Sequence, residues 1–174
     1  MSVVQKVFGT HSEREIKRIQ GLVKKIEDLR PTMIELTDEQ LRDKTKEYKK
    51  IEENEAMYEE YRMDDAEVCI VAFGVASRVS KNAIDKAREK GIKVGMIRPI
   101  TLWPFPKKAL SAAADKVKAF VSVELSMGQM IEDIELATRC KKPVLLCNRV
   151  GGMIPTTENV LEKIAEANKI GGAE

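Results

Sequence analysis

The side chains best suited to binding chemistry lie directly after apolar runs of the sequence. Five polar residues share this placement: Arg78, Arg98, Glu124, Gln129 and Arg149. Glycines beside them could open helices, and helix N-termini combined with arginines can bind a small anion. In a plainer interpretation, the glycines form turns while the arginines pair with Glu124 or face a partner chain. We expect these residues to have a binding or interface role.

No constellation in the sequence is typical of catalysis. The single histidine, His11, stands beside a helix-start signal, and we expect it in a solvent-facing loop. A zinc site needs several His or Cys ligands, and the three cysteines form no Cys-x-x-Cys pair. Neither a Gly-x-Gly-x-x-Gly turn nor a P-loop for phosphate occurs. We therefore predict no catalytic residue and no metal ligand in this chain.

Charge and composition argue against two further classes of protein. The 174 residues carry a formal net charge of +2, with basic and acidic residues interleaved, so no nucleic-acid footprint is expected. No apolar run approaches the ~18 residues that a membrane span requires. Unpaired cysteines inside apolar runs fit a reducing compartment. These features predict a soluble, cytoplasmic protein.

From residue 64 onward, a repeated pattern positions the candidate residues. Strand-like runs at 68–73, 93–98, 119–124 and 143–147 are each followed by apolar residues at helical spacing. Strands that are apolar on both faces are typical of a parallel sheet covered by helices on both sides. We predict an α/β domain over residues 64–174, with an open, mainly parallel sheet and a binding edge beyond the carboxyl ends of its strands.

Residues 1–63 carry only helical signals. Capping boxes at Ser12–Glu15 and Thr37–Gln40 start two helices, and Pro31 marks the end of the first or lies just beyond it. The first helix has a narrow apolar stripe of Ile16, Ile19, Val23 and Ile26. Such a stripe buries little by itself. We predict an N-terminal helical extension that needs a surface to lie on.

One proline-rich segment interrupts the domain, Arg98-Pro-Ile-Thr-Leu-Trp-Pro-Phe-Pro106. Each proline fixes its own φ and favours extended conformations at the residue before it. The segment should therefore be a stiff connection at the carboxyl edge. Trp103 and Phe105 on this frame are either wedged into the core or presented to a partner, and we expect them at an interface rather than in a ligand pocket.

The residues from about 51 to 167 resemble the C-terminal domain of the α subunit of 2-oxoacid:ferredoxin oxidoreductases, in the 2-oxoisovalerate (VorB-type) or 2-oxoglutarate branch. The resemblance lies in the proline segment and in further motifs, Tyr58-Glu-Glu-Tyr61, Asp65-Ala-Glu-Val68, Ala72-Phe-Gly74, Gly91-Ile-Lys-Val-Gly95, Val123-Glu-Leu-Ser-Met-Gly-Gln-Met130 and Arg149-Val-Gly-Gly152. It implies a fold like that of the transketolase C-terminal domain.

The first 47 or so residues are similar to a different protein, the N-terminus of the SecA preprotein translocase motor. Phe8-Gly-Thr-His-Ser-Glu-Arg-Glu-Ile-Lys-Arg18 and Leu36-Thr-Asp-Glu-Gln-Leu-Arg-Asp-Lys-Thr45 carry this similarity. The Walker motifs of a SecA ATPase do not occur in the sequence. The chain therefore looks like a chimera with its junction near Thr45–Ile51.

The first resemblance implies a function in oxidative decarboxylation of 2-oxoacids to acyl-CoA. Such a complex uses thiamine diphosphate, Mg, iron–sulfur clusters and CoA, held by parts that do not correspond to this chain. The resemblance thus implies a non-catalytic domain, inactive alone, that binds other subunits or forms a homodimer. Two alternatives stay open: an interaction protein whose helical arm docks on a membrane or a translocase, and a small-anion-binding module.

Overall fold

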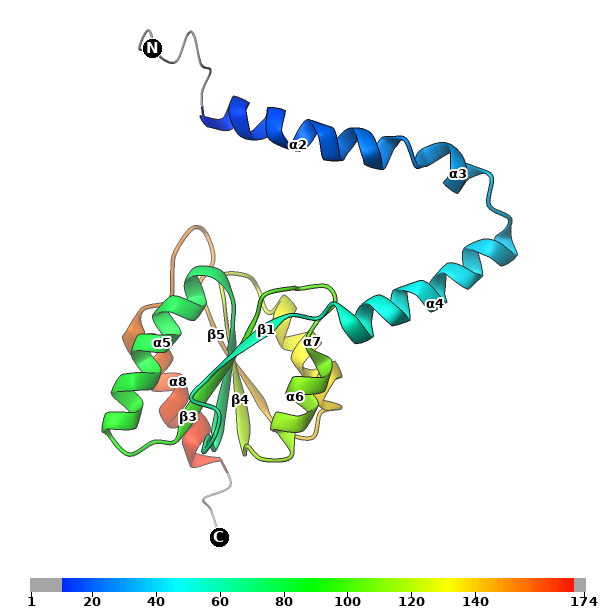
Figure 1. Ribbon diagram of the computed structural model, residues 1–174. Coiled ribbons are helices and arrows are strands. Elements are labelled where there is room, and N and C mark those ends of the chain that lie inside the picture. Colours follow the sequence, from blue (N-terminus) through cyan, green and yellow to red (C-terminus); the bar gives the residue numbers. More distant parts are fainter. Residues whose placement is uncertain (1–10, 171–174) are drawn as a thin grey trace, which may run out of the picture. The chain divides into compact units, whose positions relative to one another are not determined.

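The computed structural model describes residues 11–170, which fall into two compact units, 11–49 and 50–170. The N-terminal unit contains helices α2 (His11–Glu27) and α3 (Arg30–Ile34) and most of α4 (Asp38–Asn54). The second unit is the α/β domain (Figure 1).

The α/β domain is built on a five-stranded sheet, in the order β1-β3-β2-β4-β5. Strands β2 (Val68–Ala72), β3 (Val94–Pro99), β4 (Ala119–Glu124) and β5 (Val144–Asn148) are parallel to their neighbours. Only β1 (Tyr58–Tyr61) is antiparallel, on the outer side of β3. This arrangement confirms the predicted open, mainly parallel sheet.

Helices cover both faces of the sheet (Figure 1). Helices α5 (Gly74–Glu89) and α8 (Thr157–Lys169) pack on one face, and α6 (Lys107–Ala114) and α7 (Gln129–Thr138) pack on the other. All five residues of β2 are buried because side chains on its two faces enter two different cores. Burial of apolar area at ~25 cal/mol per Å² is the main stabilising contribution of these layers.

Strand β1 corrects the prediction of a helical extension up to residue 63. Its Tyr-Glu-Glu-Tyr sequence has two charged residues and no apolar run, so only its tyrosines signal a strand. Tyr61 packs against the α5 layer and donates its hydroxyl to Asp85 Oδ2 at 2.9 Å. Beyond the strand, the chain passes so close to Gly95 that a Cβ there would lie 2.5 Å from the Arg62 carbonyl oxygen.

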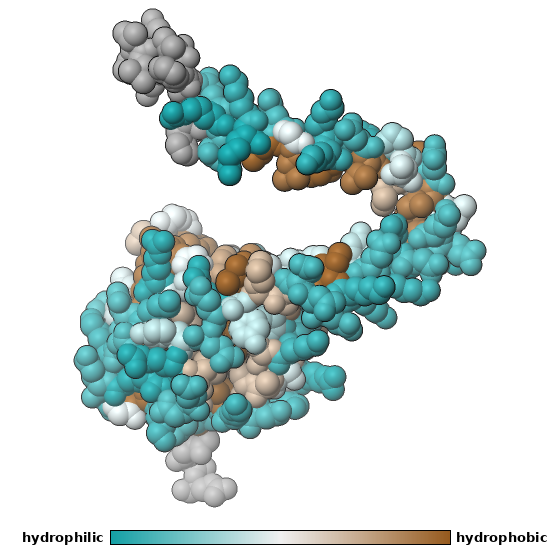
Figure 2. Space-filling model, in the orientation of Figure 1, coloured by the Kyte–Doolittle hydropathy of each residue, from teal (hydrophilic) through white to brown (hydrophobic). Residues whose placement is uncertain are grey.

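The helices of the N-terminal unit expose their apolar side chains. Residues 12–35 are all exposed, and Figure 2 shows a brown stripe along α2 and α3. The predicted capping box before α4 is confirmed, with the Gln40 N–H donating to Thr37 Oγ1 and the Thr37 N–H to Gln40 Oε1. Pro31 lies in the first turn of α3, after α2 has ended. Within residues 11–170, no helix is long and apolar enough to cross a membrane.

The proline segment separates its two aromatic rings. The Trp103–Pro104 peptide is cis, and Trp103 is 56% exposed. Phe105 is only 6% exposed and belongs to the core under α6 and α7. This corrects the expected interface position of Phe105. The residue directly precedes Pro106, the N-cap of α6, and its ring packs beneath that helix. Trp103 alone stays on the surface.

Candidate functional site

The loops that follow the four parallel strands meet at the carboxyl edge of the sheet. Between β2 and β4 the order of connections reverses, because the chain leaves β2 for β3 on one side and leaves β4 for β5 on the other. Ligands of open α/β sheets bind at such a reversal. A hollow of about 220 Å³ lies there, lined by residues 73–76 after β2 and 124–126 around the end of β4. Its lining is mostly apolar.

Glu124 lies at this hollow but is only 1% exposed. The Ser122 hydroxyl donates to Oε1 at 2.8 Å, while the Ser126 hydroxyl and the Met130 N–H, at 3.1 Å, donate to Oε2. The Met130 N–H belongs to the first turn of α7, where a negative charge is favourable. Glu124 therefore fills the helix start that an external anion would use. The alternative in which the arginines pair with Glu124 is therefore wrong, because serines and a backbone N–H occupy its carboxylate.

The loop that carries this carboxylate is fixed at both ends. Gly128, the N-cap of α7, has φ of 103°, in the left-handed region that favours glycine. Asn148 at the end of β5 donates its side-chain amide to the Ser126 carbonyl at 2.7 Å. The spacing Ser-x-Glu-x-Ser, followed by glycine, is the signal that could have predicted this internal anion site.

The three arginines of the sequence prediction are held apart by different partners. Arg98 Nη1 donates to Glu59 Oε2 on β1 at 2.8 Å, and Arg149 Nη2 donates to Asn159 Oδ1 on α8 at 3.3 Å. Arg78 is exposed on α5. The residues that line the hollow at the sheet reversal include none of the three. The structure thus does not gather them into one anion-binding cluster, and Arg98 instead joins β1 to β3.

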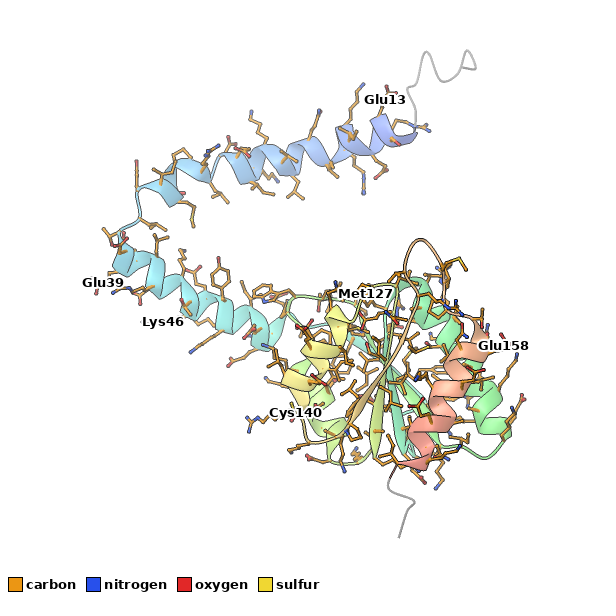
Figure 3. All side chains as sticks on the ribbon, turned by 180° about the vertical axis from the view of Figure 1, so that it is seen from behind. Glu13, Glu39, Lys46, Met127, Cys140 and Glu158 are labelled. Atoms are coloured by element: carbon orange, nitrogen blue, oxygen red, sulfur yellow. The ribbon has the colours of Figure 1, made fainter. Side chains whose placement is uncertain are left out.

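Exposed apolar side chains, rather than arginines, gather at the carboxyl edge of the sheet. Large apolar side chains follow all four parallel strands and are 38–73% exposed. We name this set the carboxyl-edge rim: Val75, Ile100, Leu102, Trp103, Leu125, Met127, Val150, Met153 and Ile154. Brown and tan side chains mark this edge of the domain in Figure 2, and Figure 3 shows Met127 there, before the start of α7. Exposed Gln129 adjoins the rim. Contiguous apolar surface on a folded domain usually marks an interaction site.

The described residues offer little for nucleophilic or metal chemistry. Burial raises the pKa of the Cys69 thiol to about 12, and burial also raises the pKa of Cys147, so neither forms a ready thiolate. Within residues 11–170, no group of three or more His, Cys, Asp or Glu side chains could hold a metal ion. The geometry of the carboxyl edge therefore supports protein contacts better than a reaction.

Comparison with known proteins places both parts of the chain. Residues 66–160 match the pyruvate:ferredoxin oxidoreductase core domain II family. The ketoisovalerate oxidoreductase subunit VorB of Methanothermobacter thermautotrophicus is 52% identical over 119 residues, or 68% of this chain and 34% of VorB. This chain therefore spans about a third of that relative's length. The 2-oxoglutarate:ferredoxin oxidoreductase of Magnetococcus marinus has the same fold, with a TM-score of 0.58 and 24% identity over 64% of this chain and 20% of that one.

A second family model, the SecA DEAD-like domain, matches residues 4–98. The protein translocase subunit SecA of Lachnoclostridium phytofermentans is 55% identical over 49 residues, which are 28% of this chain and 6% of SecA. Each model covers more than half of the chain, and residues 66–98 fall within both. The chain thus belongs to the pyruvate:ferredoxin oxidoreductase core domain II family through its α/β domain, and to the SecA DEAD-like family through its N-terminal part.

Proposed function

We propose that the α/β domain serves as the C-terminal domain of the α subunit of a 2-oxoacid:ferredoxin oxidoreductase, with 2-oxoisovalerate or 2-oxoglutarate as substrate of the complex. Its role is assembly of the subunits that decarboxylate the 2-oxoacid to acyl-CoA. The carboxyl-edge rim carries this proposal, because nine exposed apolar side chains on one edge of a folded domain need a protein surface to cover them. The VorB relative supplies the class of complex.

The rim, in this proposal, contacts other domains or subunits and takes no direct part in catalysis. Each oxygen of the Glu124 carboxylate, the one buried carboxylate of the described residues, already accepts hydrogen bonds. The residues at this edge therefore do not fit a ligand set for Mg or thiamine diphosphate. Cofactors of the complex, including CoA and iron–sulfur clusters, would be held by other parts of it. The isolated chain should then be inactive in reducing ferredoxin with a 2-oxoacid.

A binding experiment tests the rim directly. The tagged full chain is mixed with Methanothermobacter ketoisovalerate oxidoreductase whose VorB lacks the third that matches this chain, and bound subunits are measured by pull-down. We expect retention by the wild-type chain. Burying a large apolar side chain contributes ~1.5–3 kcal/mol. The double variant Trp103→Ser/Met127→Ser should therefore weaken binding by more than about tenfold.

Ile34 provides a matched control for Met127. The two side chains are 74% and 73% exposed, but Ile34 lies on α3, in the N-terminal unit rather than in the α/β domain. The Ile34→Ser chain should bind as the wild type does. Equal loss of binding in the control, or no retention of the wild-type chain, would contradict assembly through the rim. Ferredoxin reduction by the chain alone would contradict its inactivity.

A second candidate function rests on the exposed stripe of the N-terminal helices. Ile19, Val23 and Ile26 are 46–59% exposed on α2, beside basic residues such as Lys24. An amphipathic helix of this kind can dock on an anionic membrane or on a translocase. Co-sedimentation with vesicles of anionic phospholipid should then be lost on deletion of residues 1–45 and in Ile19→Ser/Ile26→Ser, but kept in Gln20→Ser. Equal sedimentation of all four proteins would rule out this role.

A further inference from the structure

A second surface of the α/β domain combines cations with an exposed apolar side chain. A groove of about 370 Å³ runs between helices α6 and α7, lined by Lys107, Lys108 and Ser111 from α6 and by Leu136, Ala137 and Arg139 from α7 and its end. Leu136 is 74% exposed within it. Figure 3 shows Met127 and Cys140 at the two ends of α7, so Leu136, one turn before Cys140, lies away from the rim.

The six residues that line the groove include three cations and no carboxylate. Of its three cations, only Lys107 is in an ion pair, with Glu52 at 2.9 Å, and this pair is itself 56% and 37% exposed. Lys108 and Arg139 form no ion pair with any other residue in 11–170, and both are exposed. Helix α6 also begins here, after Pro106 and without a side-chain cap, so the positive end of its dipole adds to the lysines.

Backbone geometry holds the far side of the groove in place. Arg139 is the C-cap of α7 and adopts φ of 55°, in the left-handed region. Its N–H donates to the carbonyl of Leu136 at 3.3 Å and also bonds to that of Glu135. The arginine and the leucine are thereby joined through one helix end. A ligand that contacts Leu136 is therefore brought beside Arg139.

We propose that this groove is the docking site for an acidic segment of a partner protein, one that carries an apolar side chain among its carboxylates. Charge complementarity selects the carboxylates, which would meet Lys108 and Arg139. Leu136 selects the apolar side chain, because a purely anionic ligand would leave it exposed. The docking site is separate from the carboxyl-edge rim. Failure of the docking proposal would therefore leave the proposed assembly function unaffected.

A labelled acidic peptide tests this proposal on the full chain. The probe is a fluorescein-labelled peptide with two repeats of Glu-Leu-Glu-Asp-Leu-Glu, and fluorescence anisotropy measures its binding. An exposed ion pair contributes up to about a fivefold change in affinity. We therefore expect Lys108→Gln/Arg139→Gln to weaken binding by about tenfold and to flatten its dependence on salt. Leu136→Ser should weaken binding by about fivefold while leaving the salt dependence unchanged.

Two controls make the result decisive. Lys90→Gln/Lys169→Gln removes the same charge from exposed sites at the ends of α5 and α8, on the other face of the sheet, and should bind as the wild type does. A peptide with all its carboxylates changed to amides should not bind. The proposal is overturned if the wild-type chain does not bind the acidic peptide, or if both double variants lose affinity equally. It is also overturned if inorganic phosphate or an RNA oligonucleotide competes equally well and Leu136→Ser has no effect.

Discussion

Replacing Glu124 by alanine would show how much one buried carboxylate stabilises the carboxyl edge. The substitution leaves the hydroxyls of Ser122 and Ser126 and the Met130 N–H without their acceptor. A buried unsatisfied donor costs about 1–3 kcal/mol, and loss of the negative charge at the helix start adds ~0.3–2 kcal/mol. The hydroxyls can rotate toward other acceptors, whereas the amide cannot. We expect the free energy of unfolding to fall by about 3–5 kcal/mol.

Glutamine at the same position separates hydrogen bonding from charge. Its oxygen can still accept from Ser126 and Met130, and its amide can donate to the Ser122 hydroxyl, which is able to accept. Only the charge is lost, so the cost should be about 1–2 kcal/mol. Glu132→Ala is the matched control, because Glu132 is also in the first turn of α7 but is exposed. That substitution should cost less than about 0.5 kcal/mol.

Urea unfolding followed by far-UV circular dichroism measures all three variants, and linear extrapolation gives the free energy in water. Unchanged slopes would show that the variants share the same folded and unfolded states. The reasoning would be refuted if glutamine destabilised the domain as much as alanine does, because charge rather than acceptor geometry would then hold the loop. It would equally fail if the alanine variant unfolded at the urea concentration of the wild type.

Three further expectations follow from local structure. Ellman's reagent should modify the exposed Cys140 rapidly, but Cys69 and Cys147 only after unfolding. Burial raises the pKa of both of these thiols. Fast reaction of all three cysteines would contradict the burial of Cys69 and Cys147. Gly95→Ala should lower the melting temperature by several degrees, because the new Cβ would lie 2.5 Å from a backbone oxygen; an unchanged melting temperature would contradict this close packing. The hydrogen bond from Arg88 of α5 lowers the pKa of the Asp65 carboxyl below its ordinary value of 3.8. The extra stability of the wild type over Asp65→Asn should therefore be present at neutral pH and be lost as pH falls below about 3.8, and a constant difference down to lower pH would refute this link.

The sheet was predictable from sequence because three of its strands, β2, β3 and β4, are almost wholly buried. Continuous apolar runs such as that of β2 are typical of parallel strands covered by helices on both faces. Strand β1 was not predictable in this way, since it lies at the sheet edge and carries Glu59 and Glu60. Charges of this kind protect an edge strand from pairing with other chains. The property that suits β1 to the edge is the same property that hides it in the sequence.

The positions of the candidate site residues in the fold were predictable from sequence, but their hydrogen-bond partners were not. Spacing placed Glu124 and Arg98 at the carboxyl edge, since Glu124 ends β4 and Arg98 is the last residue but one of β3. It could not show that Glu124 turns inward to the start of α7, or that Arg98 meets Glu59 on a strand that had not been recognised. Partners across a sheet depend on strand order, which a single sequence does not specify.

Strand order also decides how the two family matches divide the chain. Residues 66–98, which both models cover, contain β2, α5 and β3. Strand β2 lies between β3 and β4 and pairs with both, so these residues cannot be assigned to an N-terminal module without removing the centre of the sheet. Helices α3 and α4, by contrast, contain no buried residue, and single helices of such length are marginal in water. The shared stretch therefore belongs physically to the oxidoreductase-like domain, and the SecA-like part is the helical arm that precedes it.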